Sequence, residues 1–480
     1  MNNNKKSNGI SRKDFLKQGM AASAMFTGAG LFTGSCTREE MANPGDAKNI
    51  IFLVVDGMSH GTFALGDLVK HRQFGERSHW MELYNSDRNF HRGVMDMASL
   101  DSPVTDSAAA SSSWGCGNRV NNRAVCMGPN GEKYPPILQV MKQAGKKTGM
   151  VTTARITHAT PAGFAANIDH RDKEDQIAEQ YLQRKYDLLM GGGSRHFDPN
   201  QREDGKDLHK AYSDNGYTVV HDKKGLANAE VNKPLLGTFS EAHMPYALDR
   251  SSSKQLRKTV PNLAEMTETA LSHLSGHPDG FFLQVEGGRV DHGGHDNDAG
   301  ALIYDQIDFD EALKVALDFY DGRDDTLLII TTDHGTGNPG LSGAGEDYSE
   351  TATRFDRIQG FSQTNDWILS GVDHNSSENE IRDRMVHATN LDIEKEHADM
   401  MQKALREELQ TPYYLKNEIE AVLGSILANY TSINFIGTNH TADYVELSAL
   451  GPGVETLDHF TRNTELFDLM VEAAGVEVQR

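Results

Sequence analysis

The sequence predicts a doubly wound α/β fold, with a mostly parallel central sheet flanked by helices and with a helical insertion. From Asn49 onward, short runs that are apolar on both faces alternate with helical patterns. Such runs are typical of parallel strands buried between two layers of helices. Strands that alternate with helices indicate this fold class. A length of 480 residues allows one large domain with insertions, or two or three ordinary domains.

Five apolar runs are the clearest candidate strands. They are Asn49–Val55, Thr148–Thr153, Tyr186–Gly193, Gly280–Glu286 and Thr326–Thr332. Between them lie helical stretches such as Leu263–Leu274 and Tyr304–Tyr320, and Tyr444–Gly451 reads as a later strand. We therefore assign residues 47–480 to one α/β domain.

The stretch from about Gly340 to Ile426 breaks the alternation. It contains a helical run with Met401, Leu405 and Leu409 at four-residue spacing, which Pro412 should end, and a second helical run should follow from Tyr413. We interpret the stretch as an insertion, either a cap or an element that joins two copies in a homodimer.

The first 36 residues have the layout of an export signal. A polar, basic stretch is followed by small, weakly apolar residues, and the apolar part is too short to span a bilayer. "SRKDFLK" resembles a twin-arginine signal, with Arg12-Lys13 in place of the arginine pair. Cys36 ends a loose lipobox, so it is either lipidated after cleavage or incidental. We expect an exported protein, periplasmic or lipid-anchored to the cell envelope.

The charge is strongly acidic, with 69 Asp and Glu against 47 Lys and Arg, or −22 in total. Such a chain is a poor match for nucleic acid or an anionic membrane, so we expect no nucleic-acid-binding surface. An anionic substrate would need a few placed arginines or metal ions. There are three cysteines; Cys116 and Cys126 could pair in an oxidising compartment, but their spacing does not establish it.

Three of the predicted strands end in an acid. Asp56, Glu286 and Asp333 each stand at or directly after the last residue of an apolar run. Ligands bind outside the carboxyl ends of strands in open α/β sheets, so the three carboxylates should gather at one edge. Unpaired acids in a cleft repel one another, and metal cations remove that repulsion. The acids alone therefore predict a metal site.

Histidines follow the same strand ends. His292, His295 and His334 lie beside Asp291 or Asp333, and His440 in "GTNHTADY" is a weaker candidate on its own. Imidazole with carboxylate suits zinc, whereas carboxylate with hydroxyl and water suits magnesium.

A candidate nucleophile lies in "SPVTDSAAASSSWGCGN". Thr105 and Asp106 are residue types that begin helices, which would put Ser107 in a first turn. Backbone N–H groups and the helix dipole favour an anion there. The plainer alternative is that Asp106 and Ser107 only cap the helix.

Taken together, these segments resemble the alkaline phosphatase family. The motifs occur in the family's order: "VVDGM" at Asp56, "VTDSAAA" at Ser107, "HATPAGFAANIDHR" from His158 to Arg171, "VEGGRVDHGGH" from Val285 to His295, "TTDHG" at Asp333-His334, and "NHTADYVELSALGPG" at His440. The inserted region carries none of them.

The resemblance implies a centre with two zinc ions and one magnesium ion. Its candidate ligands are Asp291, His295 and His440 for one zinc; Asp56, Asp333 and His334 for the second; and Asp56, Thr160 and Glu286 for magnesium. Arg171 would grip two phosphate oxygens. Some bacterial members have aspartate and lysine where this chain has His158 and His292, which leaves the affinity of the third site open. We interpret Arg289 as a partner in a structural ion pair.

The function that follows is hydrolysis of phosphate monoesters at alkaline pH through a phosphoserine at Ser107. Arg171 and the magnesium set of Thr160 and Glu286 argue for monoesters. The alternatives are a phosphodiesterase or sulfatase of the same superfamily, or a secreted metal- or phosphate-binding protein without catalysis.

Overall fold

The computed structural model describes residues 45–344 and 348–478. The export signal and the lipidation of Cys36 fall outside the described residues and stay predictions. Within the described ranges, no helix has the length and apolar character needed to cross a membrane.

The centre of the fold is a ten-stranded sheet in the order β14-β2-β13-β8-β1-β7-β3-β4-β6-β5. Its strands are β1 (Asn49–Val55), β2 (His91–Asp96), β3 (Lys147–Arg155), β4 (Leu188–Gly192), β5 (Thr218–Val220), β6 (Leu235–Thr238), β7 (Phe281–Gly287), β8 (Thr326–Thr332), β13 (Val445–Leu450) and β14 (Phe460–Arg462). All pairs from β8 to β5 are parallel, and β13 is antiparallel to both neighbours. The predicted fold class is confirmed.

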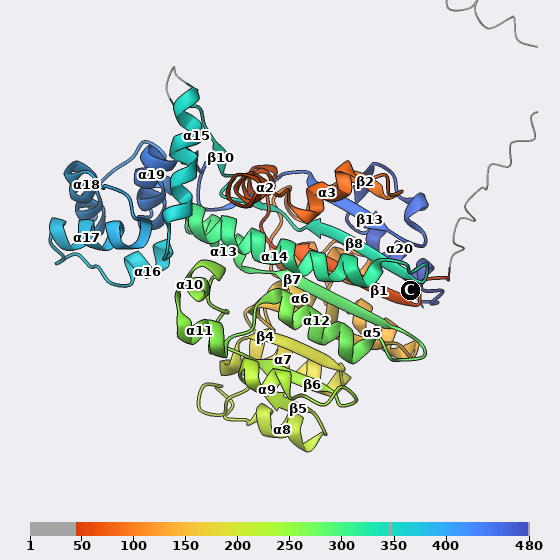
Figure 1. Cartoon of the computed structure of the whole chain (residues 1–480). Coiled ribbons are helices and arrows are strands. Elements are labelled where there is room, and N and C mark those ends of the chain that lie inside the picture. Colours follow the sequence, from red (N-terminus) through yellow and green to blue (C-terminus); the bar gives the residue numbers. More distant parts are fainter. Residues whose placement is uncertain (1–44, 345–347, 479–480) are drawn as a thin grey trace, which may run out of the picture. The chain divides into compact units, whose positions relative to one another are not determined.

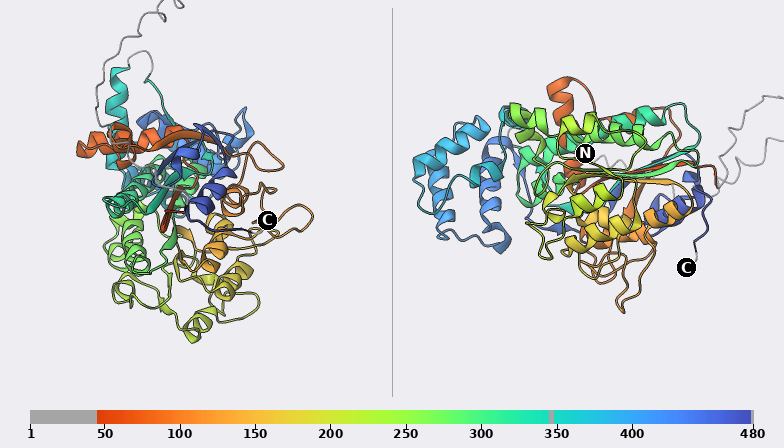
Figure 2. Two further views of the ribbon diagram at one scale, coloured as in Figure 1. Left: turned by 90° about the vertical axis from the view of Figure 1, so that its right-hand side faces the viewer. Right: turned by 90° about the horizontal axis from the view of Figure 1, so that it is seen from below.

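Helices cover both faces of this sheet, as Figure 2 shows with the sheet seen edge-on. Along β1, Ile51, Leu53 and Val55 pack in one buried cluster and the alternate residues in another. The first cluster includes α2 (His60–Phe74), α3 (His79–Asn85), α12 (Leu263–Leu274) and α14 (Ala299–Tyr320). The second includes α4 (Ser107–Cys116), α5 (Ile137–Gln143), α6 (Ala159–Ala165), α7 (Glu174–Arg184), α8 (Leu208–Asp214) and α20 (Glu465–Ala473). This two-sided burial explains why the central strands are continuous apolar runs.

The remaining helices of the α/β part are short. They are α9 (Lys223–Ala227), α10 (Ala247–Ser252), α11 (Lys254–Thr259) and α13 (Arg289–His295). Of these, α13 matters most for the site, because it begins directly after β7 and carries Asp291 and His295.

The region predicted as an insertion folds into helices that Figure 1 shows at the left. They are α15 (Ser349–Asp356), α16 (Asn365–Leu369), α17 (Glu378–Thr389), α18 (Lys395–Leu405) and α19 (Ile419–Thr431). The helix α18 ends before the predicted stop at Pro412, because Glu407 adopts a left-handed φ of 59°. The next α-helix begins at Ile419 rather than at Tyr413, which is followed only by a short 3₁₀ turn.

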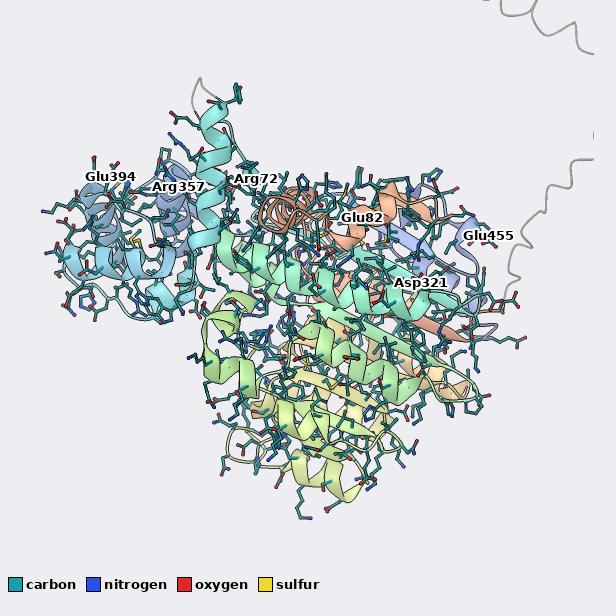
Figure 3. The ribbon with its side chains drawn as sticks, viewed as in Figure 1. Arg72, Glu82, Asp321, Arg357, Glu394 and Glu455 are labelled. Atoms are coloured by element: carbon teal, nitrogen blue, oxygen red, sulfur yellow. The ribbon has the colours of Figure 1, made fainter. Side chains whose placement is uncertain are left out.

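These helices pack against the α/β core. Ile381, Met385 and Leu423 belong to the same buried cluster as the β1 side chains. Arg72 of α2 pairs with Asp356 at the end of α15 at 2.6 Å, and both Arg72 and Arg357 are labelled in Figure 3. The two ends of the region meet in a short ribbon, β10 (Gly340–Leu341) with β11 (Ile433–Asn434). Its role as a cap or a dimer element stays a prediction.

A second ribbon has a direct bearing on the site. It pairs β9 (Gly335–Thr336) with β12 (His440–Thr441) in antiparallel register, with His440 opposite Thr336. The pairing brings His440, from near the end of the chain, next to His334: their rings stack with centroids 3.7 Å apart.

Candidate active site and metal centre

The three acids predicted at strand ends lie side by side. The strands β8, β1 and β7 are neighbours, with Val55 opposite Thr332 and Val54 opposite Glu286. Asp56 and Asp333 therefore come directly after paired residues of neighbouring strands, and Glu286 lies on the strand at the other side of β1. The side chains of Asp56, Glu286 and Asp333 are fully buried. Three buried carboxylates at one edge require compensating positive charge.

The first group of candidate ligands lies beside Ser107. Asp56, Asp333 and His334 place ligand atoms within 4.8 Å of one another. The Nε2 atom of His334 is 3.1 Å from Asp333 Oδ2, 3.7 Å from Asp56 Oδ1 and 3.4 Å from the Ser107 hydroxyl oxygen. Asp333 Oδ1 accepts hydrogen bonds from the backbone N–H groups of Gly57 and His334, which leaves Oδ2 directed at the group.

Asp291, His295 and His440 form the second group. The two histidine Nε2 atoms are 3.1 Å apart, and the Asp291 carboxylate lies 3.4 and 3.6 Å from them. Each ring donates through Nδ1 to a backbone carbonyl, of Thr438 and of Thr105 respectively. A neutral imidazole that donates through Nδ1 presents a lone pair at Nε2. The Nε2 lone pairs of His295 and His440 and the carboxylate of Asp291 therefore face one another. A cation bound among them would stabilise this arrangement.

The third group shares Asp56 with the first. Asp56, Glu286 and His158 place ligand atoms within 4.8 Å of one another. The Thr160 hydroxyl, in the first turn of α6, donates to Asp56 Oδ2 at 3.3 Å. Asp56 thus belongs to two candidate ligand groups, and the ions that they hold stay a prediction.

The charge balance of the site fits divalent cations. Asp56 Oδ1, Asp333 Oδ2 and both carboxylate oxygens of Glu286 are buried and accept no hydrogen bond from the protein. Burial, together with the carboxylates of Asp333, Asp291 and Glu286, raises the pKa of Asp56 well above its usual range. Burial raises the pKa of Glu286 to about 8. Bound cations would satisfy these oxygens and remove the penalty of ionising them.

Ser107 is the first residue of α4, and Asp106 caps the helix by accepting from the Ala109 N–H at 2.9 Å. Arg171 donates to Asp106 Oδ2 at 2.9 Å through one terminal nitrogen, and the other lies 3.0 Å from His158 Nε2. Asp106 therefore both starts the helix that carries Ser107 and fixes Arg171. Asp106 can therefore cap α4 and also belong to the candidate active site, because its carboxylate accepts from both the Ala109 N–H and Arg171.

Two residues that the sequence analysis did not single out belong to this region. The Thr336 hydroxyl donates to Asp291 Oδ1 at 2.6 Å and lies 3.2 Å from His334 Nδ1, so it links the first and second groups. His243 packs against both His158 and His292, whose ring centroids lie 5.3 and 4.1 Å from its own. In the sequence, only its position two residues after His334 indicates that Thr336 lies near the site. His243 follows β6, a strand that was not predicted.

Arg289 does not form the predicted ion pair. No carboxylate of a described residue lies within ion-pair distance of it. Its guanidinium lies over the ring of Tyr246, 3.6 Å from the centroid. Its Nε is buried without a hydrogen-bond partner.

Cys116 and Cys126 are both buried free thiols in this structure. The Cys126 thiol donates to the Gly163 carbonyl at 3.0 Å. A disulfide between them is therefore not formed here.

Gly57 shows why glycines accompany these motifs. Its φ is 77°, in the left-handed region, and a Cβ at this position would lie 2.5 Å from Asp291 Cα. Only glycine allows the end of β1 to approach α13 so closely. The close approach is what brings Asp56 and Asp291 into one site.

Comparison of the chain with known proteins identifies its family. The model of the family described as alkaline phosphatase matches residues 47–476. The chain belongs to the alkaline phosphatase family. Alkaline phosphatase 4 of Bacillus subtilis is 30% identical over 461 residues, covering 93% of this chain and 94% of that protein. The repressible alkaline phosphatase of Saccharomyces cerevisiae is 35% identical over 322 residues, covering 60% of this chain and 55% of that protein.

Solved structures agree with the family assignment. The crystal structure of Thermus thermophilus alkaline phosphatase superimposes with a TM-score of 0.84 and 33% identity, covering 94% of this chain and 97% of that chain. The chain is therefore an alkaline phosphatase-family enzyme, and the family implies divalent metal cofactors. The candidate metal-binding groups described above lie at the carboxyl ends of the central parallel strands.

Proposed function

We propose that this enzyme hydrolyses phosphate monoesters through a phosphoserine at Ser107, at a centre that holds two zinc ions and one magnesium ion. The observation that carries the proposal is the position of the Ser107 hydroxyl. It lies 3.4 Å from His334 Nε2, inside a ligand group, and at the N-terminus of a helix.

The ligand chemistry supports the choice of ions. Imidazole-rich groups, such as Asp291 with His295 and His440, suit zinc, and so does the group of His334. The carboxylates of Asp56 and Glu286 with the Thr160 hydroxyl suit magnesium. His158 adds an imidazole to this third group, so analysis of bound metals decides which ion it holds.

Each protein group has a defined task in the proposed reaction. Bound ions would lower the pKa of the serine hydroxyl and neutralise charge on the phosphoryl group and on the departing oxygen. Ser107 attacks phosphorus through its oxygen while the bond from phosphorus to the alcohol oxygen breaks, and the alcohol leaves with a proton. Water then cleaves the phosphoserine, which releases phosphate and restores the serine hydroxyl. Arg171, held by Asp106, presents its guanidinium to the phosphoryl oxygens. The first-turn N–H groups of α4 add positive potential where negative charge develops.

Arg171 distinguishes a monoesterase from the phosphodiesterase alternative. A monoester dianion has three non-bridging oxygens, so it can contact ions and still offer two oxygens to a guanidinium. A diester has only two, and its second ester group must fit where Arg171 reaches. A bidentate charge-assisted contact is worth roughly 2–4 kcal/mol, so Arg171→Ser should lower kcat/KM for a monoester by about 30- to 1,000-fold and for a diester clearly less.

The measurement compares an aryl phosphate with the matched aryl methyl phosphodiester, on the parent enzyme and on Arg171→Ser. Equal losses on both substrates, or a parent enzyme that prefers the diester, would overturn the monoesterase proposal in favour of the phosphodiesterase. No turnover of either ester by the metal-replete parent enzyme would favour a binding protein.

A further inference from the structure

A pocket of about 320 Å³ opens beside the second ligand group. Its wall includes His295 and His440 of that group, and Asp106, the residue before Ser107. A substrate that reacts at Ser107 places its phosphoryl group among the ligand groups, and its departing organic part, which lies outside them, can extend into this neighbouring space. The side chains of the pocket can therefore select among leaving groups.

Arg123 is the one permanently charged cationic side chain in the described wall of this pocket. It is exposed, and no hydrogen bond or ion pair of its guanidinium occurs among the described residues. Asp106, the acid in the same wall, is already paired with Arg171 at 2.9 Å. Arg123 is therefore not needed to neutralise that acid, and its donors are available to a ligand.

The backbone around Arg123 is fixed to the site. The Arg123 carbonyl accepts from the N–H of Arg171 at 2.8 Å. The Asn122 side chain accepts from the N–H of Asp106 at 2.8 Å and donates to the Val104 carbonyl at 3.1 Å. The backbone from which the Arg123 side chain extends is thus tied to Asp106, the residue before Ser107, and to Arg171.

The conformation of Arg123 is also unusual. Its φ of 73° lies in the left-handed region, which favours glycine and disfavours long side chains. Strained backbone that persists beside a site is grounds for a functional hypothesis. Here the strain places a cationic side chain at the entrance of the leaving-group pocket in a protein of charge −22.

We propose that Arg123 is a specificity residue that binds a second anionic group, a carboxylate or a phosphate, on the leaving group of the substrate. The inference rests on the proposed phosphomonoesterase function. An anion there forms charge-assisted hydrogen bonds with the guanidinium, whereas a neutral leaving group gains nothing from it. The preferred substrates are then phosphate monoesters whose alcohol part carries a further negative charge.

Two matched pairs of esters test this. 2-Phosphoglycerate differs from glycerol 2-phosphate by a carboxylate in place of a hydroxymethyl group. Propane-1,3-diol bisphosphate differs from the monophosphate by a second phosphate. In Arg123→Gln, the ratio of kcat/KM for the anionic ester to that for the neutral ester should fall about tenfold in at least one pair. Loss in one pair only identifies which anion the residue binds.

Two control variants separate a specific contact from general charge. Arg123→Lys keeps the cation and should retain most of the ratio. Lys133→Gln removes the same charge from an exposed residue of the same segment and should leave the ratio as in the parent. Unchanged ratios in Arg123→Gln for both pairs, or equal losses in Lys133→Gln, would overturn the assignment while leaving the phosphomonoesterase function intact. A parent enzyme that hydrolyses none of the four esters would overturn both.

Discussion

Ser107 is the proposed nucleophile, whose oxygen forms the bond to phosphorus. Its hydroxyl lies 3.4 Å from His334 Nε2, and its position at the start of α4 comes from the Asp106 cap. The Ser107 hydroxyl is not required for the helix to form, because alanine is a better helix residue than serine and the Asp106 cap stays in place. Loss of the hydroxyl should therefore remove turnover without unfolding the chain.

Ser107→Ala should lower kcat by at least about 10³, since a nucleophile contributes several kcal/mol to the barrier. Ser113→Ala is the matched control, because the Ser113 hydroxyl of the same helix donates only to the Ala110 carbonyl, at 2.6 Å. The control should keep its activity. The check is the initial rate with an aryl phosphate for both variants, each metal-replete and each with a parent-like circular dichroism spectrum. A Ser107→Ala enzyme with parent-like kcat would eliminate the serine as nucleophile.

Thr336 is a positioning residue that the structure adds to the candidate site. Its hydroxyl donates to Asp291 Oδ1 and lies beside His334 Nδ1, so it contacts one ligand in each of the first two groups. Groups that orient metal ligands typically contribute about 10–100-fold to metal affinity. Thr336→Val keeps the shape of the side chain and removes the hydroxyl, so zinc affinity should fall by about that factor.

Competition with a chelator measures this zinc affinity directly. Zinc bound as tightly to Thr336→Val as to the parent would show that the hydroxyl does not support the ligands. A lower affinity with a normal kcat at saturating zinc is the signature of a positioning role, because the hydroxyl contacts no substrate.

At the scale of single elements, the start of α7 is held to the end of β3 by a buried network. Glu174 accepts from Arg155 at 2.6 Å and from the Thr157 hydroxyl at 2.7 Å, and it lies 3.2 Å from His196. Burial raises the pKa of Glu174, but the bonds to His196 and Arg155 outweigh it and hold that pKa well below the usual range. This network contributes to the stability of the fold rather than to the proposed chemistry.

Glu174→Gln should reduce the free energy of unfolding at pH 7 by about 1–3 kcal/mol, the range for hydrogen bonds to charged groups. Because the folded pKa is depressed, the ionised form stabilises the fold fully above the unfolded pKa of about 4.3, and this is lost as pH falls. The difference between parent and variant should therefore stay nearly constant from pH 7 to about pH 5 and shrink as the pH falls below about 4.3. Denaturant unfolding at several pH values checks it; a difference that grows on acidification would contradict the assignment.

The central elements were predictable from the sequence because their burial is two-sided. The strands β1 and β8 were predicted with the ends that the structure gives them, since every one of their residues is buried. The strand β14, at one edge of the sheet, and its neighbour β2 are partly exposed and carry no continuous apolar run. The strands β5 and β6 have three and four residues, which is too short for a recognisable period.

The part of the candidate site that lies at the ends of strands was predictable from the sequence. Asp56, Glu286 and Asp333 were expected at one edge, and the sheet places them there. Contacts that depend on packing were not predictable. His243 and the stacking of Arg289 on Tyr246 arise only after distant loops fold together. The expected ion pair of Arg289 was wrong for this reason.

At the scale of the whole molecule, the candidate centre joins segments from Asp56 to His440. Their common position depends on the sheet order and on the β9–β12 ribbon. The surface is acidic, and Figure 3 shows Glu82, Asp321, Glu394 and Glu455 on the outside of the ribbon. An acidic protein that handles a phosphate dianion depends on Arg171 and bound cations for local positive charge. Turnover should therefore depend on bound metal ions.

The most direct test is turnover of an aryl phosphate by the enzyme before and after removal of its metals, with bound metals measured in the same samples. The metal-free enzyme should lose at least about 10³ in kcat/KM, and zinc with magnesium should restore it together with two zinc ions and one magnesium ion per chain. A metal-free enzyme that turns over the ester at the parent rate would contradict the account, because the buried carboxylates of Asp56, Glu286 and Asp333 would then act without the cations that their environment requires.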